Sequence, residues 1–165
     1  MANAGKIVVV PAKAGEVDIV LEILNEARAW LLERGIDQWG PGSLTCERFL
    51  EWISRGEVYL AKVGEESIGT VTLQWSEEWF WGQNPPDAGY VHRLAIRPTQ
   101  TGKNLGLYIL KWAEETARAE GKKYLRLNCR ADDRKLRAYY EQVGFLHKGD
   151  KTDPRFKTSL YEKAL

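Results

Sequence analysis

The chain has 165 residues, of which 44% are hydrophobic and 28% are charged. This length fits one domain, and the composition is typical of a globular protein rather than a disordered one. The 24 basic and 23 acidic residues leave a formal net charge of +1, which argues against a general nucleic-acid or membrane binder. We therefore expect residues 1–165 to form a single domain.

Cysteine usage and hydropathy bear on the compartment. Cys46 and Cys129 form neither a CxxC pair nor a disulfide framework, as is typical of a reducing environment. No apolar run approaches the ~20 residues of a membrane span. The N-terminal segment MANAGKIVVV has too short an apolar core and too little charge for a signal peptide. These features predict a soluble cytoplasmic protein.

Hydrophobic spacing and turn residues predict the elements of the fold. In chain order they are a strand at residues 6–11, a helix at 16–34, a helix capped by Ser43 and ended by Gly56, strands at 58–63 and 68–74, a loop at 75–87, a strand at 90–97, a helix at 104–120, a strand at 124–129, a helix capped by Asp132 or Asp133 and ended by Gly144, and strands at 145–148 and 159–163. This order predicts an α/β fold with a mixed, mostly antiparallel central sheet flanked by helices on both faces.

The turn at residues 100–106, called the 100–106 turn below, comes where the helix at 104–120 begins. Backbone N–H groups at a helix start lack intrahelical partners, and the helix dipole adds partial positive charge. Gly102 lets an anion approach the backbone, and Lys103 adds a full positive charge. The turn matches neither GxxxxGK[ST] nor GxGxxG. By itself it therefore leaves a phosphate-binding turn and a plain helix cap as alternatives.

The surrounding motifs are more specific. Leu94-Ala95-Ile96 ends the strand before the turn, and YLRLNC, ADD and LRAYYEQVGF follow the helix, with Tyr140 and Gly144-Phe145 at the end. This arrangement, over residues 90–145, resembles the GNAT superfamily of N-acetyltransferases, with its hLAV strand, Q/R-x-x-G-x-G/A loop and downstream Y-x-x-x-G-F. The resemblance implies a GNAT fold, acetyl-coenzyme A as co-substrate, no metal, and acetylation of a primary amine of a small molecule or peptide.

The cofactor contacts are expected along the strand end, the turn and the next strand-to-helix connection. The candidate residues are Leu94, Ala95, Ile96, Thr101, Gly102, Lys103, Asn104, Leu105, Gly106, Asn128, Asp133 and Tyr140. By resemblance, a strand bulge at Leu94 to Ile96 frees an N–H for the thioester oxygen.

Three positions depart from the family pattern. Thr101 replaces Arg or Gln but keeps its backbone N–H, and Asn104 replaces a Gly while tolerating positive φ. Because backbone donors do most of the phosphate binding in such a turn, we expect it to survive these changes. Asp133 replaces Asn and leaves the contact at that position open.

The chemistry requires an acid and the loss of a proton from the amine, whose pKa is about 10. By resemblance Tyr140 is the acid that protonates the coenzyme A thiolate; the alternative is a core tyrosine, which is our interpretation of Tyr139. Cys129 has no recognisable His partner, so direct transfer in a ternary complex is favoured over an acetyl-cysteine.

The general base is less clearly marked. His92 lies two residues before Leu94, so strand alternation puts both on one face, and its usual pKa suits proton removal. A structural histidine is the alternative. Glu77 and Glu78 are weaker candidates, and a water relay would need no single base.

Three tryptophans, Trp75, Trp79 and Trp81, precede the motif strand. They could line an apolar or cation-binding acceptor pocket, or instead form a small core or a homodimer contact. Two non-catalytic alternatives also stay open at this stage: a coenzyme A-binding regulatory module, and an interaction protein that docks through the tryptophan loop.

Overall fold

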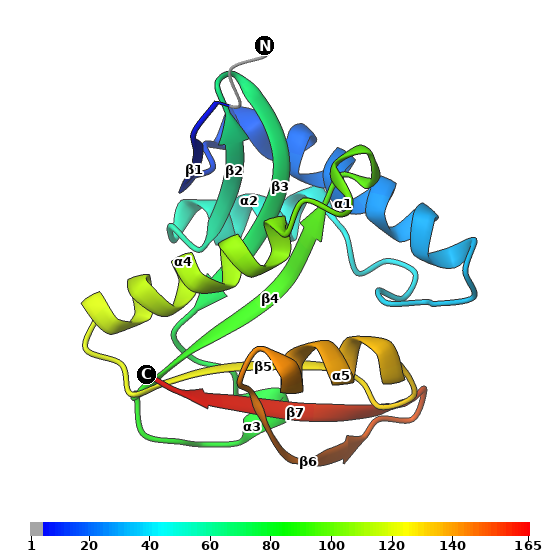
Figure 1. Cartoon of the computed structure of the whole chain (residues 1–165), viewed down its shortest axis with the longest axis vertical. Helices are drawn as coiled ribbons and strands as arrows, with labels where there is room; N and C mark the ends of the chain where they lie inside the picture. Colours follow the sequence, from blue (N-terminus) through cyan, green and yellow to red (C-terminus); the bar gives the residue numbers. More distant parts are fainter. Residues whose placement is uncertain (1–4) are drawn as a thin grey trace. The chain divides into compact units, whose positions relative to one another are not determined.

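The computed structural model describes residues 5–165 (Figure 1). The first four residues of the segment considered above as a possible signal lie outside the described residues. The chain forms two compact units, which we describe separately. Unit 1 runs to Thr72 and includes Arg93–Ile109; unit 2 contains Leu73–His92 and Leu110–Leu165. The expectation of a single domain stays a prediction.

The predicted order of strands and helices is confirmed, except that the structure adds a short helical turn between the third and fourth strands. The strands are β1 (Ile7–Pro11), β2 (Val58–Val63), β3 (Glu66–Gln74), β4 (Ala88–Ile96), β5 (Tyr124–Arg130), β6 (Leu146–Thr152) and β7 (Lys157–Ala164). The helices are α1 (Val17–Leu32), α2 (Cys46–Ser54), α3 (Glu78–Trp81), α4 (Leu105–Ala119) and α5 (Arg134–Gln142), with short 3-10 turns η1 (Ala14–Glu16) and η2 (Pro98–Gln100). Across residues 5–165, no helix has the length and apolar character needed to span a membrane.

The seven strands form one mixed sheet in the order β1-β2-β3-β4-β5-β7-β6. The pairs β1/β2, β2/β3, β5/β7 and β6/β7 are antiparallel, whereas β4 pairs with β5 in parallel. The parallel register covers only Ala88–Tyr90 against Tyr124–Arg126, while β5 continues to pair with β7 as far as Arg130.

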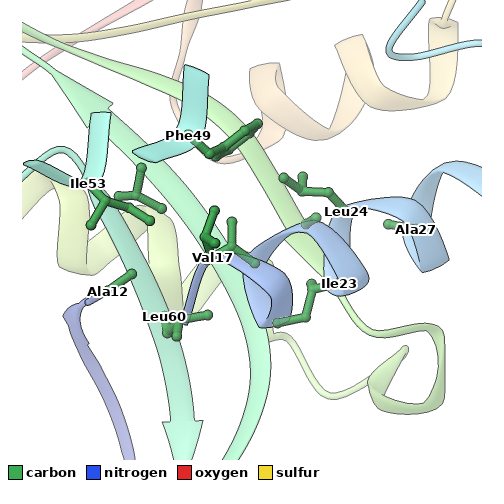
Figure 2. Packing of buried hydrophobic residues seen from close by; sticks show 11 residues of the cluster. Ala12, Val17, Ile23, Leu24, Ala27, Phe49, Ile53 and Leu60 are labelled. Atoms are coloured by element: carbon green, nitrogen blue, oxygen red, sulfur yellow. The ribbon is translucent and has the colours of Figure 1, made fainter. Parts of the chain in front are cut away.

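The core of unit 1 lies between the first two helices and the sheet. Val20, Ile23 and Leu24 recur at helical spacing on α1 and are fully buried. Figure 2 shows side chains of α1 and α2, among them Leu24 and Phe49, gathered over β2, which contributes Leu60. Each such residue contributes about 1.5–3 kcal/mol through burial. The aliphatic periodicity of the sequence therefore determines this half of the fold.

Unit 2 is built on the antiparallel strands β5, β7 and β6, with α5 lying over β5 and β7 (Figure 1). Its buried aromatic residues meet beneath the helix. The ring of Tyr140, from α5, lies 5.9 Å from that of Phe145 and 6.1 Å from that of Tyr161. Gly144, with a φ of 102°, ends the helix as predicted.

Two local predictions need correction. Thr45, not Ser43, caps α2: its hydroxyl accepts the N–H of Arg48 at 3.4 Å, whereas the Ser43 hydroxyl donates to the Gly40 carbonyl at 2.8 Å. Residues 75–87 also contain a helical turn, α3, because a carboxylate oxygen of Glu77 accepts the Phe80 N–H at 2.9 Å and caps it. The first error arises because Ser43 and Thr45 are both suitable cap residues, and the second because a four-residue helix is too short to show a helical period.

Candidate active site

The 100–106 turn has the conformation that its sequence predicts. Gly102 and Asn104 have φ values of 86° and 56°, so Asn104 takes up the left-handed backbone for which glycine is usual. The Asn104 carbonyl accepts the N–H of Tyr108 at 3.1 Å, which begins α4. The N–H groups of Leu105 and Gly106 fall in the first turn of that helix, where no intrahelical acceptor exists.

The side chains of the turn are occupied locally. The hydroxyl of Thr101 donates to the Pro98 carbonyl at 2.8 Å, and Lys103 donates to the side-chain oxygen of Gln100 at 2.9 Å. The backbone N–H of Thr101 also donates to Pro98, at 3.2 Å. It is therefore not available to a ligand in this conformation, which corrects the expectation that Thr101 contributes a backbone donor.

The remaining backbone donors fit a phosphate. Within residues 5–165, the N–H groups of Gly102, Lys103 and Asn104 make no hydrogen bond to the protein. A Cβ at Gly102 would meet nothing within 4 Å, so its surroundings are open. Free amide hydrogens, a lysine and a helix start together suit a pyrophosphate of the kind that coenzyme A carries.

Strand β4 is irregular just before its motif. Arg93 has a φ of 46°, in the middle of an otherwise extended strand. The resemblance puts the bulge at Leu94 to Ile96, and the left-handed residue directly precedes this stretch. Ala95 is only 4% exposed and packs into the core of unit 1, while Leu94 and Ile96 are half-buried.

The same irregularity affects the base candidate. His92 is half-buried on β4, and Arg93 separates it from Leu94. A left-handed residue breaks the alternation of side chains along a strand. The alternation argument that put His92 and Leu94 on one face therefore fails across Arg93, and the role of His92 stays a prediction.

Tyr140 is buried, at 8% exposure, in unit 2. Burial, with smaller effects from Cys129, Tyr139 and Asp133, raises the pKa of its hydroxyl well above the usual value for tyrosine. The group therefore holds its proton at neutral pH, as a general acid must. Tyr139, beside it, is half-buried, and burial also raises its pKa.

The neighbouring thiol is suited to packing. Cys129 is 3% exposed on β5, and burial, reinforced by the negative charge of Asp133, raises the pKa of its thiol to about 12. A thiol with such a pKa is almost wholly protonated at neutral pH, so it is a poor nucleophile.

Two further cofactor candidates differ in availability. The side chain of Asp133 accepts the Leu136 N–H at 3.1 Å and caps α5, which resolves the choice between Asp132 and Asp133. Asn128 is half-buried on β5, and its amide nitrogen is buried without a hydrogen-bond partner in the described part of the chain. A buried donor left unpaired is costly, so Asn128 is the better candidate for a ligand contact.

The three tryptophans of the predicted pocket each face a different cation of unit 2. Lys122 lies 5.4 Å from the Trp75 ring, Lys151 lies 5.3 Å from that of Trp79, and Arg126 lies 5.0 Å from that of Trp81.

Trp79 is 65% exposed, and its carbonyl accepts a hydrogen bond from Lys151. Each of the three rings thus already has one cation of the chain beside it, and the three cations are different residues. Burial raises the pKa of the Glu77 carboxyl, which caps α3.

Several charged residues were not singled out from the sequence. Arg126 is only 7% exposed; it donates to Glu162 and to the Tyr90 hydroxyl, both at 2.8 Å. Arg93 stacks on Trp52 at 5.0 Å. Strand arginines are normally solvated at their tips, so only the tertiary contacts distinguish these two. For Arg93, the available signal was its position directly before Leu94-Ala95-Ile96.

No group of three or more His, Cys, Asp or Glu residues within residues 5–165 is arranged to hold a metal ion.

Comparison with known proteins gives consistent matches. The sequence profile of the Acetyltransferase (GNAT) family matches residues 24–145. The uncharacterized N-acetyltransferase YesJ of Bacillus subtilis (strain 168) is 31% identical over 143 residues, covering 82% of this chain and 79% of the relative. A GNAT family acetyltransferase from Listeria monocytogenes 4b F2365 has the same fold, with a TM-score of 0.85 at 22% identity, covering 100% and 98% of the two chains. The PaiA N-acetyltransferase of Thermoplasma acidophilum, in complex with coenzyme A, has a TM-score of 0.76 at 19% identity, covering 97% and 99%.

The chain therefore belongs to the GNAT family of acetyltransferases. It is an N-acetyltransferase that uses acetyl-coenzyme A. The two non-catalytic alternatives considered from the sequence are not retained.

Proposed function

We propose that this enzyme acetylates a primary amine of a small molecule or peptide, by direct attack of the amine in a ternary complex. The observation that carries the proposal is the 100–106 turn, whose left-handed Asn104 and unpaired N–H groups suit a pyrophosphate. When bound, acetyl-coenzyme A supplies an acetyl thioester as the acyl donor. Residues Gly102 to Gly106 hold its phosphates through backbone N–H groups.

Tyr140 is the proposed general acid. Burial keeps its hydroxyl protonated, so the group can deliver a proton to a departing thiolate sulfur. The N–H groups of Leu94 to Ile96, which follow the left-handed Arg93, are the proposed donors to the developing oxyanion. His92 or a water receives a proton from the ammonium group of the acceptor, because only the neutral amine can attack the thioester.

Direct attack is supported by the state of Cys129. A covalent route needs a thiolate, and the buried Cys129 thiol, with a pKa of about 12, supplies almost none at neutral pH. Asn128, with its unpaired buried amide nitrogen, is a proposed hydrogen-bond donor to the bound molecule. Trp75, Trp79 and Trp81 are proposed to border the acceptor site.

The proposal is tested by a thermal-shift and turnover screen with acetyl-coenzyme A. Acceptors would be simple amines, amino acids, polyamines and peptides, and turnover would be followed by release of the free thiol. We expect acetyl-coenzyme A to raise the melting temperature and one acceptor class to give N-acetylated product by mass spectrometry. Cofactor binding without acetylation of any primary amine would contradict the proposed acceptor class.

A further inference from the structure

Two arginines of unit 1 gather around one tryptophan. The guanidinium of Arg93, from β4, lies 5.0 Å from the ring centre of Trp52 and 6.0 Å from that of Phe49. The guanidinium of Arg48, one turn before Trp52 on α2, lies 6.0 Å from the same indole. Phe49 is fully buried, Trp52 and Arg93 are half-buried, and Arg48 is exposed. The pair thus extends from the core of the unit to its surface.

Neither arginine has an acidic partner in the part of the chain that the structure describes. Among residues 5–165, no carboxylate forms an ion pair with Arg93 or Arg48, and the Nε of Arg93 is buried without a hydrogen-bond partner. Arg97 shows the contrast: it donates to Glu22 and Glu26 at 2.7 Å each and to the Ser67 carbonyl. The fold therefore neutralises the arginine that follows the motif and leaves the one before it unpaired.

An unpaired, partly buried charge is unfavourable. Burial, with repulsion from Arg48, lowers the pKa of the Arg93 guanidinium from its usual value to about 10. A buried cation next to a second cation is normally retained only where an anion completes it. Aromatic contacts orient a guanidinium but do not replace its hydrogen-bond acceptors. Two neighbouring guanidinium groups without a carboxylate partner among residues 5–165 are an arrangement that suits an anion.

Two anions could occupy such a site: a phosphate of the cofactor or a carboxylate of the acceptor. The cofactor phosphates already have a proposed position at the 100–106 turn, which has its own N–H donors and Lys103. Arg93 directly precedes Leu94-Ala95-Ile96, the stretch to which the thioester is assigned, and its left-handed backbone interrupts the strand there. An anion at Arg93 would lie near the reacting end, where the acceptor binds.

We propose that Arg93 and Arg48 form an anion-binding subsite for a carboxylate of the acceptor, so that the acceptor is an amine of the amino-acid type. This inference rests on the proposed function. The planar guanidinium of Arg93 matches a carboxylate through two parallel hydrogen bonds, and Arg48 adds charge from the open side. Trp52 and Phe49 hold the Arg93 side chain and exclude water from one of its faces.

The experiment compares carboxylates with matched neutral analogues. The twenty L-amino acids and their C-terminal amides would be assayed with acetyl-coenzyme A on the wild type, Arg93→Met, Arg48→Met and Arg34→Met. Arg34 is the matched control, because its guanidinium also stacks on a tryptophan, 3.5 Å from the ring centre of Trp30. Methionine keeps the length of the side chain and removes its charge.

We expect the wild type to prefer an amino acid to its amide. Arg93→Met should lower kcat/KM for that amino acid by roughly ten- to a hundred-fold, mainly through KM, because charge-assisted hydrogen bonds are lost. The KM for acetyl-coenzyme A and the activity on the amide should stay within about twofold of the wild type. Arg48→Met should act in the same direction with a smaller effect, and Arg34→Met should behave as the wild type.

Three outcomes would overturn the inference: no preference for acids over amides, equal losses on both in Arg93→Met, or a rise in the KM for acetyl-coenzyme A alone, which would assign the site to the cofactor. If no amine is acetylated, the proposed function fails, and thermal shift with coenzyme A still decides the subsite. If an amino acid raises the melting temperature of the wild type more than its amide does, and Arg93→Met loses this difference, the subsite is supported. Equal shifts in melting temperature with the amino acid and the amide would reject the subsite.

The stability of Arg93→Met gives a separate readout. A purely structural arginine would lower the melting temperature when removed, whereas an unpaired cation held for a ligand should not. We expect the melting temperature of the unliganded variant to equal or exceed that of the wild type. A marked decrease would assign Arg93 a packing role, and Arg48→Met, at an exposed position, would then test the subsite without disturbing the fold.

Discussion

The hydroxyl of Tyr140 is held in its neutral form by its surroundings. Its ring packs among Tyr139, Phe145 and Tyr161, and burial raises its pKa above the usual value for tyrosine. A raised pKa means that the folded protein resists ionisation of this group. The associated stabilisation is fully present below the pKa of an unfolded tyrosine, about 10, and is lost as the pH rises toward the folded value.

We expect Tyr140→Phe to lower kcat by a factor on the order of 10²–10⁴, since it removes the proposed proton donor and keeps the ring. Tyr139→Phe is the matched control and should keep nearly full activity. The Tyr139 hydroxyl has no proposed role in the reaction, and burial alone raises its pKa. Because the Tyr140 hydroxyl stays protonated, its ionisation should cause no loss of kcat between pH 7 and about 10. Steady-state kinetics should therefore show the same pH dependence for the wild type and Tyr140→Phe over this range. Wild-type rates in Tyr140→Phe would remove Tyr140 from the mechanism.

At the scale of elements, the 100–106 turn and the start of α4 act together. Asn104 supplies the left-handed turn and the first carbonyl acceptor of the helix, and Leu105, 6% exposed, anchors the helix start in unit 1. The hydrogen bonds of Thr101 to Pro98 close the preceding 3-10 turn. The donors for a phosphate are therefore backbone groups held by local structure, and side chains can vary around them.

Gly106→Val should abolish binding of acetyl-coenzyme A with the fold intact. A branched side chain in the first turn of α4 would block the approach of a phosphate to the N–H groups, while valine in a helix is no worse than glycine. Calorimetry would give the affinity, and circular dichroism the fold. Gly15→Val is the control, because a Cβ at Gly15 meets nothing within 4 Å. An unchanged affinity in Gly106→Val would discard the turn as the phosphate site.

Most elements could be predicted from the sequence because their patterns are local. Val20, Ile23 and Leu24 repeat at helical spacing, and Gly144 marks a helix end whatever surrounds it. The residue that caps a helix is harder to predict. The choice of Thr45 over Ser43 depends on which hydroxyl accepts a backbone N–H after the loop has folded. The α3 turn was missed because four residues are too few to show a helical period.

The residues of the candidate site also fall into two groups, those found from local motifs and those that only the fold brings together. The turn and Tyr140 were found because their motifs are contiguous in the chain. The tryptophan pocket was predicted from clustering in the sequence, yet Trp75, Trp79 and Trp81 face different cations in the fold. The relation of Arg93 to Arg48 joins residues 45 positions apart (93 minus 48), and no sequence pattern reports whether such a charge has a partner.

At the scale of the whole molecule, three elements continue through both units. Strands β3 and β4 and helix α4 each begin in one unit and end in the other. Continuous hydrogen-bonded elements resist independent unfolding, because breaking one unit frays the strands and helix that the other needs. We propose that residues 1–165 unfold as one cooperative domain.

Leu24→Ala provides the test. Leu24 is fully buried in the core of unit 1, and its truncation should cost about 2–5 kcal/mol of unfolding free energy. If the chain is one cooperative domain, hydrogen exchange should become faster in β5 and β7 of unit 2 as well as in α1. The exposed Leu32, truncated to alanine, is the control and should leave exchange unchanged. Faster exchange confined to unit 1 would separate the two units thermodynamically.

The sequence alone determined the order of strands and helices, the 100–106 turn and the family, because each depends on residues that lie close together in the chain. Only the tertiary structure decided which charges are neutralised. Arg97 forms ion pairs with Glu22 and Glu26, and Arg126 forms one with Glu162. Arg93 instead lies beside aromatic rings and is repelled by Arg48. The physical reason is that burial and electrostatic interaction depend on distances across the fold, which the linear order of residues does not contain.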